Sequence, residues 1–217
     1  MEILVALLLA AATVVGCGSD TSSTSSDDDT GPDAFSGYVR TPAQEVGDIT
    51  LPGSDGTPVN MAGPAGGLRI VYFGYTSCPD VCPTTMTDLK RALAGLTPEQ
   101  RSKVAVDMVT IDPDRDVPAK LAEYVTTFIP DAGAISTPDQ ALLRSATGAF
   151  GANFSVEPGP DGDPEVTHTA DLYAVDDTGQ VVLAWPFGTT SKDIGRDISR
   201  LLDGERPPSE TSTTTGS

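Results

Sequence analysis

The sequence is short of basic residues. Lys and Arg together number 13 against 31 Asp and Glu, which gives a formal net charge of -18. Nucleic-acid binding needs a basic face that neutralises phosphates, so this balance excludes nucleic acid as a partner. An acidic surface keeps an exported domain soluble and can also steer a cationic partner, and the charge alone leaves both roles open.

Cysteine and histidine are also scarce, with 3 cysteines and 1 histidine in 217 residues. Cys17 follows an apolar run, whereas Cys78 and Cys82 lie together in the middle of the chain. If processing uses Cys17, one close pair of thiols remains and no spare cysteine is left. The 4 methionines are scattered, so the sequence gives no support to a methionine-rich copper site.

No hydrophobic run is long enough to cross a bilayer comfortably as a helix. Residues 3–16 (ILVALLLAAATVVG) have the length of the apolar region of a signal peptide. They lead into Cys17 with the pattern of a bacterial lipobox, so we predict a lipoprotein signal peptide over residues 1–16 and lipidation of Cys17. Glu2 stands where signal peptides usually carry Lys or Arg, and a buried helix with a structural cysteine is the alternative interpretation.

Large apolar residues are nearly absent from residues 17–37 and 204–217, which are rich in Ser, Thr, Asp, Gly and Pro. Segments of this composition cannot bury enough apolar surface to fold. We therefore predict a disordered tether over residues 17–37, a single folded domain over residues 38–203 and a disordered tail over residues 204–217.

The domain alternates strand and helix patterns. Apolar runs at 68–75 and 104–111 are typical of buried strands, and turn-forming residues between short apolar segments predict β-hairpins at 46–61 and 168–185. Helical spacing predicts four helices, the third of them capped by Thr137 and Pro138, over residues 83–96, 117–128, 139–150 and 191–202. This order indicates an α/β fold with an N-terminal β-hairpin, in which helices flank a mixed sheet, compatible with a thioredoxin-like architecture.

The chemistry is concentrated in residues 72–83 (YFGYTSCPDVCP), which run from a strand into a helix. Four-residue spacing places both sulfurs on one side of a helix, and the helix N-terminus favours thiolates. Thiolates bind Cu(I) or zinc; zinc requires four ligands, whereas Cu(I) accepts fewer, and His168 is the only imidazole available. A lone histidine is often an ordinary surface residue, and a thiol pair also suits redox chemistry, so spacing alone leaves both interpretations open.

Three segments of the sequence resemble the Sco/SenC family of copper chaperones. They are the run 75–84 (YTSCPDVCPT), the run 110–116 (TIDPDRD) and the Thr-His-Thr at 167–169. The resemblance implies that Cys78, Cys82 and His168 bind one copper ion per domain, as Cu(I) or Cu(II). It also implies a thioredoxin-like fold and a chaperone, not an enzyme, that helps assemble the binuclear copper centre of cytochrome c oxidase.

The same resemblance implies partners and a location. The partners are the copper-site subunit of the oxidase, a copper donor and a thiol reductant. The location is the outer face of the bacterial cell membrane, to which the lipid on Cys17 would anchor this extracytoplasmic domain.

Three acidic residues near these motifs have two interpretations each. Asp112 and Asp116 either belong to a turn that caps the following helix, with Arg115 paired to a carboxylate, or lie beside the copper site. Asp80 lies between the cysteines. In the functional interpretation it tunes their electrostatics or contacts a partner, and in the other it is a solvated loop residue.

The main alternative function is that of an extracytoplasmic thiol–disulfide oxidoreductase, in which Cys78 and Cys82 form a redox disulfide. The pair has one residue more between its cysteines than the Cys-x-x-Cys of thioredoxin-type enzymes, which weakens this interpretation. A peroxidase of the same fold would need Pro and Thr at fixed positions before its reactive cysteine, and neither cysteine has them.

Overall fold

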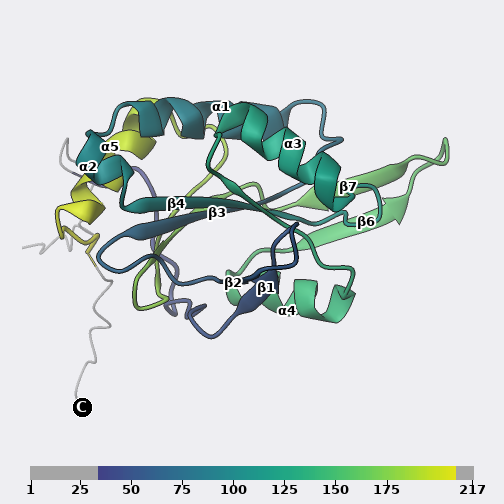
Figure 1. The fold of residues 1–217 in the computed structure, drawn as a ribbon, viewed down its shortest axis with the longest axis horizontal. Helices are drawn as coiled ribbons and strands as arrows, with labels where there is room; N and C mark the ends of the chain where they lie inside the picture. Colours follow the sequence, from purple (N-terminus) through teal and green to yellow (C-terminus); the bar gives the residue numbers. More distant parts are fainter. Residues whose placement is uncertain (1–33, 209–217) are drawn as a thin grey trace, which may run out of the picture. The chain divides into compact units, whose positions relative to one another are not determined.

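A computed structural model describes residues 34–208, and their centre is a five-stranded mixed sheet (Figure 1). The strand order is β5-β4-β3-β8-β9. β3 pairs in parallel with β4, and β4 with β5, whereas β8 runs antiparallel to both β3 and β9. The strands are β3 (Leu68–Gly74), β4 (Val104–Thr110), β5 (Gly133–Ile135), β8 (Leu172–Asp176) and β9 (Val181–Trp185).

Both faces of this sheet are covered. Figure 1 shows α1 (Val81–Ala94), α2 (Pro98–Arg101), α3 (Pro118–Phe128) and α5 (Ser191–Leu202) on one side. The other side carries α4 (Gln140–Ala149) and the hairpin of β1 (Thr50–Pro52) and β2 (Pro58–Asn60). Because strand side chains alternate, Ile70 and Tyr72 of β3 join the core under α1, α3 and α5, while Val71 and Phe73 join the core over α4.

The fold confirms the predicted α/β class and the N-terminal hairpin. The two long strands and the four predicted helices are present, and α5 has the predicted bounds. The sequence analysis missed α2, β5 and a separate antiparallel hairpin formed by β6 (Phe154–Pro158) and β7 (Pro164–His168).

Two local predictions were wrong. His168 does not open the hairpin of β8 and β9; it ends β7, opposite Phe154. The N-cap of α4 is Asp139, whose carboxylate accepts the N–H groups of Ala141 and Leu142 at 2.9 and 3.0 Å, while the Thr137 hydroxyl accepts the N–H of Asp139. A carboxylate in this position satisfies two free N–H groups of the first turn.

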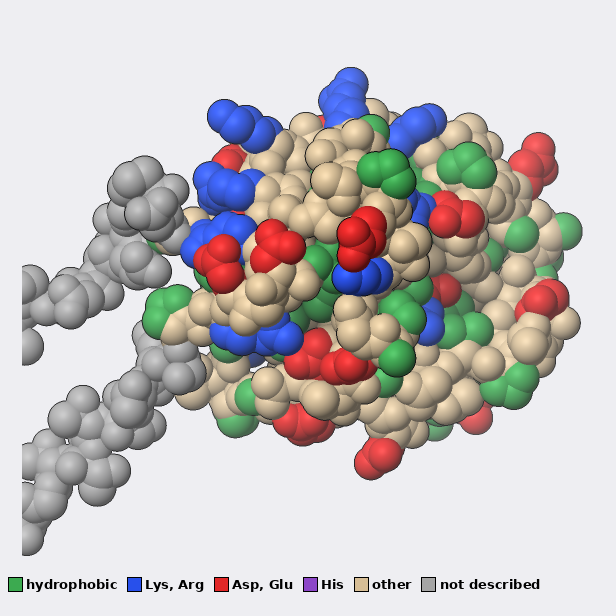
Figure 2. All heavy atoms as spheres, turned by 60° about the vertical axis from the view of Figure 1, so that its left-hand side comes forward, with side chains coloured by type: hydrophobic (Ala, Val, Ile, Leu, Met, Phe, Trp, Pro, Cys, Tyr) green, Lys and Arg blue, Asp and Glu red, His purple; other side chains and the backbone are tan. Residues whose placement is uncertain are grey.

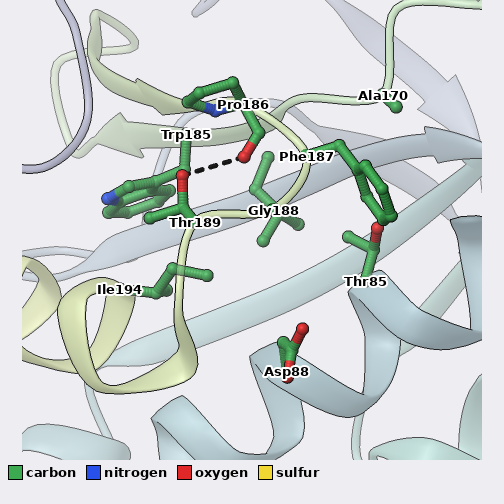
Figure 3. Close-up of a pocket in the computed structure, with 10 residues that line it drawn as sticks. Thr85, Asp88, Ala170, Trp185, Pro186, Phe187, Gly188, Thr189 and Ile194 are labelled. Carbon is green, nitrogen blue, oxygen red and sulfur yellow. Dashed lines mark hydrogen bonds between the residues drawn. The ribbon is translucent and has the colours of Figure 1, made fainter.

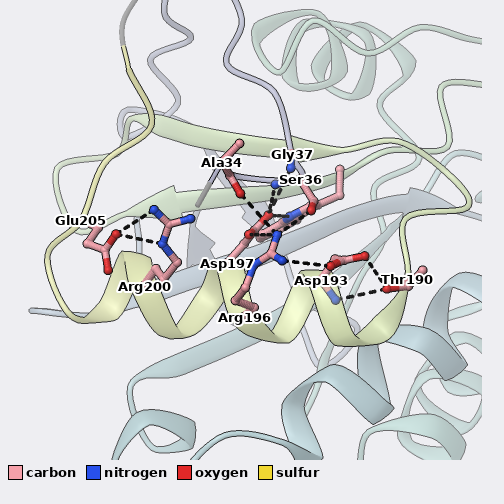
Figure 4. Close-up of polar contacts among 10 residues, drawn as sticks. Ala34, Ser36, Gly37, Thr190, Asp193, Arg196, Asp197, Arg200 and Glu205 are labelled. Atoms are coloured by element: carbon pink, nitrogen blue, oxygen red, sulfur yellow. Dashed lines mark hydrogen bonds and ion pairs between the residues drawn. The ribbon is translucent and has the colours of Figure 1, made fainter. Parts of the chain in front are cut away.

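The predicted signal peptide, Cys17 and most of the tether lie outside the described residues, as does the end of the tail. Residues 34–37, which the sequence placed in the tether, hydrogen-bond to α5 (Figure 4). Glu205 of the predicted tail pairs with Arg200 at 2.8 Å. The five-stranded sheet and both hairpins form among residues 34–208, so we expect the chain from residue 34 onward to fold by itself.

Candidate metal centre

The two cysteines lie where β3 passes into α1. Cys78 is half-buried in the connecting loop, whereas Cys82 is in the first turn of α1 and fully buried. The N–H of Cys82 donates to the Cys78 sulfur at 3.3 Å, because the first N–H groups of a helix have no partner within the helix. Gly74 permits this close packing, since a Cβ there would lie 2.6 Å from Tyr72 and 3.2 Å from the Cys82 sulfur.

The environments of the two thiols shift their pKa values in opposite directions. Burial raises the pKa of Cys78, but the N–H groups of Cys82 and Asp80 outweigh it, so the pKa of Cys78 lies below that of an ordinary thiol. Burial raises the pKa of Cys82 to about 12, although the Tyr72 hydroxyl, which donates to its sulfur at 3.3 Å, acts in the other direction. Cys78 is therefore the more accessible and more readily ionised thiol of the pair.

His168 reaches the same place from the end of β7. Its Nε2 lies 4.0 Å from the Cys82 sulfur, and its Nδ1 lies 2.9 Å from the carbonyl oxygen of Thr169. A carbonyl only accepts, so Nδ1 carries the proton and the lone pair of Nε2 faces the sulfur. Burial lowers the pKa of His168, which keeps the ring neutral, and the rings of Tyr72 and Tyr75 pack against it in T-shaped contacts.

Cys82 and His168 lie close enough together to share a metal ion. Bonds to zinc from thiolate and imidazole are about 2.3 and 2.0 Å, so two ligands of one such ion lie at most about 4.3 Å apart. The 4.0 Å between Cys82 and His168 falls within that limit. Among residues 34–208, no three His, Cys, Asp or Glu side chains are grouped closely enough to hold a metal ion, so Cys78, Cys82 and His168 do not form a complete three-ligand site in this structure.

Comparison with known proteins identifies the family. A family model described as SCO1/SenC matches residues 39–203. The chain belongs to this family. An SCO2-like protein of Rickettsia felis is 30% identical over 150 residues, which make up 68% of this chain and 72% of that protein.

Solved structures of SCO1/SenC relatives agree with the fold. Yeast Sco1 with copper bound matches with a TM-score of 0.65 at 27% identity, covering 76% of this chain and 91% of that one. Bradyrhizobium japonicum ScoI with copper bound matches with a TM-score of 0.61 at 28% identity, covering 70% and 96%. The predicted resemblance and the thioredoxin-like fold are confirmed.

The three acidic residues of the SCO1/SenC motifs differ in position. Asp80 is exposed at the N-terminus of α1, where its carboxylate makes no cap hydrogen bond, and Thr84 donates to it at 3.4 Å. Asp112 is buried and paired with Arg115, as the structural interpretation predicted. Neither Asp112 nor Asp116 caps α3, because that helix begins after Val117 without a side-chain cap.

Asp116 holds the loop that leads to the cysteines. This carboxylate is fully buried and accepts the N–H of Thr76 at 2.9 Å, the Thr76 hydroxyl, and the Thr110 hydroxyl at 2.7 Å. Lys120 lies 3.6 Å away. Asp116 therefore fixes the backbone two residues before Cys78.

Sequence reasoning gave no role to Tyr72, Tyr75 and Thr76, although all three contact the site or its support. Tyr72 could have been found, because strand alternation places it on the face of β3 that α1 covers. The pairing of Thr76 with Asp116, 40 positions apart, leaves no such pattern.

A separate small hollow lies beside α1, the helix that carries Cys82 (Figure 3). The loop after β9 lines it, with Phe187 extending toward Thr85 of α1 and Thr189 donating to the Pro186 carbonyl at 2.8 Å. Neither cysteine nor His168 lines it, so it is distinct from the thiol pair.

Proposed function

We propose that this SCO1/SenC domain is a copper metallochaperone and not an enzyme, binding one copper ion through Cys78, Cys82 and His168. The observation that carries the proposal is the approach of the unprotonated His168 Nε2 to the Cys82 sulfur at 4.0 Å. Two thiolates and one neutral imidazole are soft and borderline ligands, a set that suits copper. The copper bound in the structures of yeast Sco1 and B. japonicum ScoI supports the same choice of metal.

The three donors differ in how firmly the fold holds them. Cys82 is fixed in α1 and receives a hydrogen bond from Tyr72, and His168 is oriented by the Thr169 carbonyl. Cys78 lies in the loop and is the more accessible thiol. Delivery would begin there, with a ligand of the partner replacing Cys78 on the ion while Cys82 and His168 still hold it.

The recipient that we propose is the copper-site subunit of cytochrome c oxidase, which the family resemblance implies. A copper donor and a thiol reductant are the other partners, because two thiols that oxidise to a disulfide cannot bind copper until they are reduced. We place the domain outside the bacterial cell membrane, anchored through a lipid on Cys17. None of the helices within residues 34–208 is long and apolar enough to cross a membrane.

The second candidate is a thiol–disulfide oxidoreductase that acts on the cysteines of a copper-protein target. The observation that favours it is the lowered pKa of Cys78 beside a second free thiol. The Cys78 thiolate would attack a target disulfide and form a mixed disulfide. Cys82 would then displace the target thiol, so that the target gains two electrons and two protons and the Cys78–Cys82 disulfide forms.

Replacing His168→Ala separates these two functions. Copper(I) affinity, measured by competition with a chromophoric chelator, should fall by at least about 100-fold. Loss of a residue that only hydrogen-bonds to a metal ligand already lowers metal affinity by about 10–100-fold, and here a ligand itself is removed. The rate of dithiol–disulfide exchange should be largely unchanged, since it needs only the sulfurs.

The matched control is Thr167→Ala, one residue earlier, whose hydroxyl bonds to Ser155 and not to the site. This variant should bind copper like the wild type. A folded His168→Ala protein that keeps tight, stoichiometric copper would overturn the proposed ligand set.

A further inference from the structure

The hairpin of β6 and β7 has one apolar face, and the candidate ligand His168 belongs to it. The register pairs Phe154 with His168, Val156 with Val166, and Pro158 with Pro164. Because side chains alternate along a strand, these three pairs share one face. The opposite face is polar and carries Ser155, Glu157, Glu165 and Thr167.

The apolar face is covered only at its base. Phe154 is buried, and Val166 packs against the core that includes Phe73 and Phe150. Toward the tip Val156 is 36% exposed and Pro158 is exposed. Figure 1 shows the hairpin projecting beyond the sheet, so an apolar strip runs from the candidate ligand out of the domain.

Toward the tip of the hairpin the exposed charges are all acidic, whereas the Arg144 guanidinium lies over the Phe154 ring at its base. Glu157 and Glu165 face each other across the strands, Asp161 and Asp163 occupy the tip, and all four are exposed. The ion pairs within residues 34–208 include none of the four. Opposed like charges destabilise a hairpin, a cost that a cationic partner would relieve.

Basic residues are absent from the hairpin segment itself. The sequence has neither Lys nor Arg between Arg144 and Lys192. Figure 2, which brings the side of α5 and α2 forward, shows Lys and Arg side chains there, interspersed with Asp and Glu. The acids of the hairpin, which have no ion-pair partners among residues 34–208, therefore favour a cationic partner.

We propose that the apolar face of the β6–β7 hairpin is a docking surface for a partner protein that presents an apolar segment flanked by Lys or Arg. This inference rests on the proposed function, because a partner seated beside Val156 lies along the strip that ends at His168, where copper would be exchanged. A second copy of this chain is disfavoured, since its hairpin would bring its own carboxylates against these. Anionic lipid headgroups are disfavoured for the same reason.

The test uses the chain from residue 34 onward, reduced, metal-free and labelled with ¹⁵N. The probe is the amidated peptide Lys-Lys-Val-Phe-Val-Lys-Lys, followed by amide chemical shifts. We expect shift changes concentrated in residues 154–168, with binding at least about fivefold weaker at 0.15 M than at 0.01 M ionic strength. Peptides with Glu for Lys, or with Ser for Val and Phe, should bind much more weakly.

Paired variants divide the effect between charge and apolar contact. Glu157→Gln with Glu165→Gln should weaken binding severalfold at low salt and flatten its salt dependence. Val156→Thr, nearly the same shape, should weaken it at every salt concentration. The control Asp48→Asn with Glu123→Gln makes the same charge change on exposed acids elsewhere and should leave the shifts in place.

The outcome separates this inference from the proposed function. Shift changes spread over the acidic surface, or an equal effect of the control variant, would overturn the docking surface. Copper(I) titration of the same samples is a separate readout. Wild-type protein that binds no copper would refute the chaperone, whereas hairpin variants that bind copper normally but lose the peptide support the docking surface.

Discussion

Two fully buried carboxylates, Asp116 and Asp197, hold two different loops of this domain by the same chemistry. Asp116 accepts the N–H of Thr76 and two threonine hydroxyls near the cysteines. Asp197 accepts the N–H groups of Ser36 and Gly37 (Figure 4). It also accepts the indole N–H of Trp185. A buried carboxylate that accepts several N–H groups ties distant segments together whether or not chemistry occurs nearby.

The difference lies in what each loop carries. The segment held by Asp116 leads to Cys78, whereas the segment held by Asp197 brings the chain onto α5. Burial and hydrogen bonding alone would rank the two aspartates as equals. Only the neighbourhood of the thiols assigns one of them to the candidate site.

The largest effect on stability should come from Asp197→Ala. This change leaves two backbone N–H groups and a buried indole N–H without an acceptor, so we expect the free energy of unfolding to fall by about 3–5 kcal/mol. Urea denaturation measures it. Copper affinity of the folded protein should stay near that of the wild type. A large loss of affinity would show that Asp197 supports the copper site as well, and would contradict the distinction between the two aspartates.

A smaller loss of stability should follow Asp116→Ala, on the order of 2–3 kcal/mol, because the Thr76 and Thr110 hydroxyls can rotate toward other acceptors. Its main effect should be on the site. We expect copper(I) affinity to fall about tenfold, since the backbone before Cys78 loses its anchor. If affinity matched that of Asp197→Ala, the carboxylate would be a structural support only.

The smallest effect should appear in thiol reactivity. In the wild type, iodoacetamide should modify Cys78 much faster than Cys82, because Cys78 is more exposed and its pKa is lowered while that of Cys82 is raised to about 12. The rate for Cys78 should reach half its maximum at a pH below the pKa of an ordinary thiol. Asp116→Ala should change this rate severalfold and Asp197→Ala should not, which mass spectrometry of quenched samples can decide.

The periodicity of apolar residues was enough to predict most of the helices and strands. Strand β3 is apolar throughout because both of its faces are buried, and α5 keeps its apolar residues on one side, so both are readable from local pattern. The β6–β7 hairpin was missed because proline, glycine and acidic residues interrupt its pattern, and only the pairing of its two strands and the packing of Phe154 on the core define it.

The candidate site was predicted unevenly. Cys78 and Cys82 follow from their motif, but the place of His168 at the end of β7 depends on a hairpin that the sequence did not reveal. Its role as a ligand remains a prediction. The partners of Asp116 and Asp197 are remote in sequence, so only the folded chain brings them together.

X-ray absorption spectroscopy of the copper-loaded domain tests the central claim most directly, with wild type and His168→Ala compared. The account predicts a first shell of two sulfurs and one imidazole nitrogen in the wild type, and loss of the imidazole scattering in the variant while both sulfurs remain. A wild-type shell without sulfur, or an imidazole signal that survives the substitution of the chain's only histidine, would contradict it.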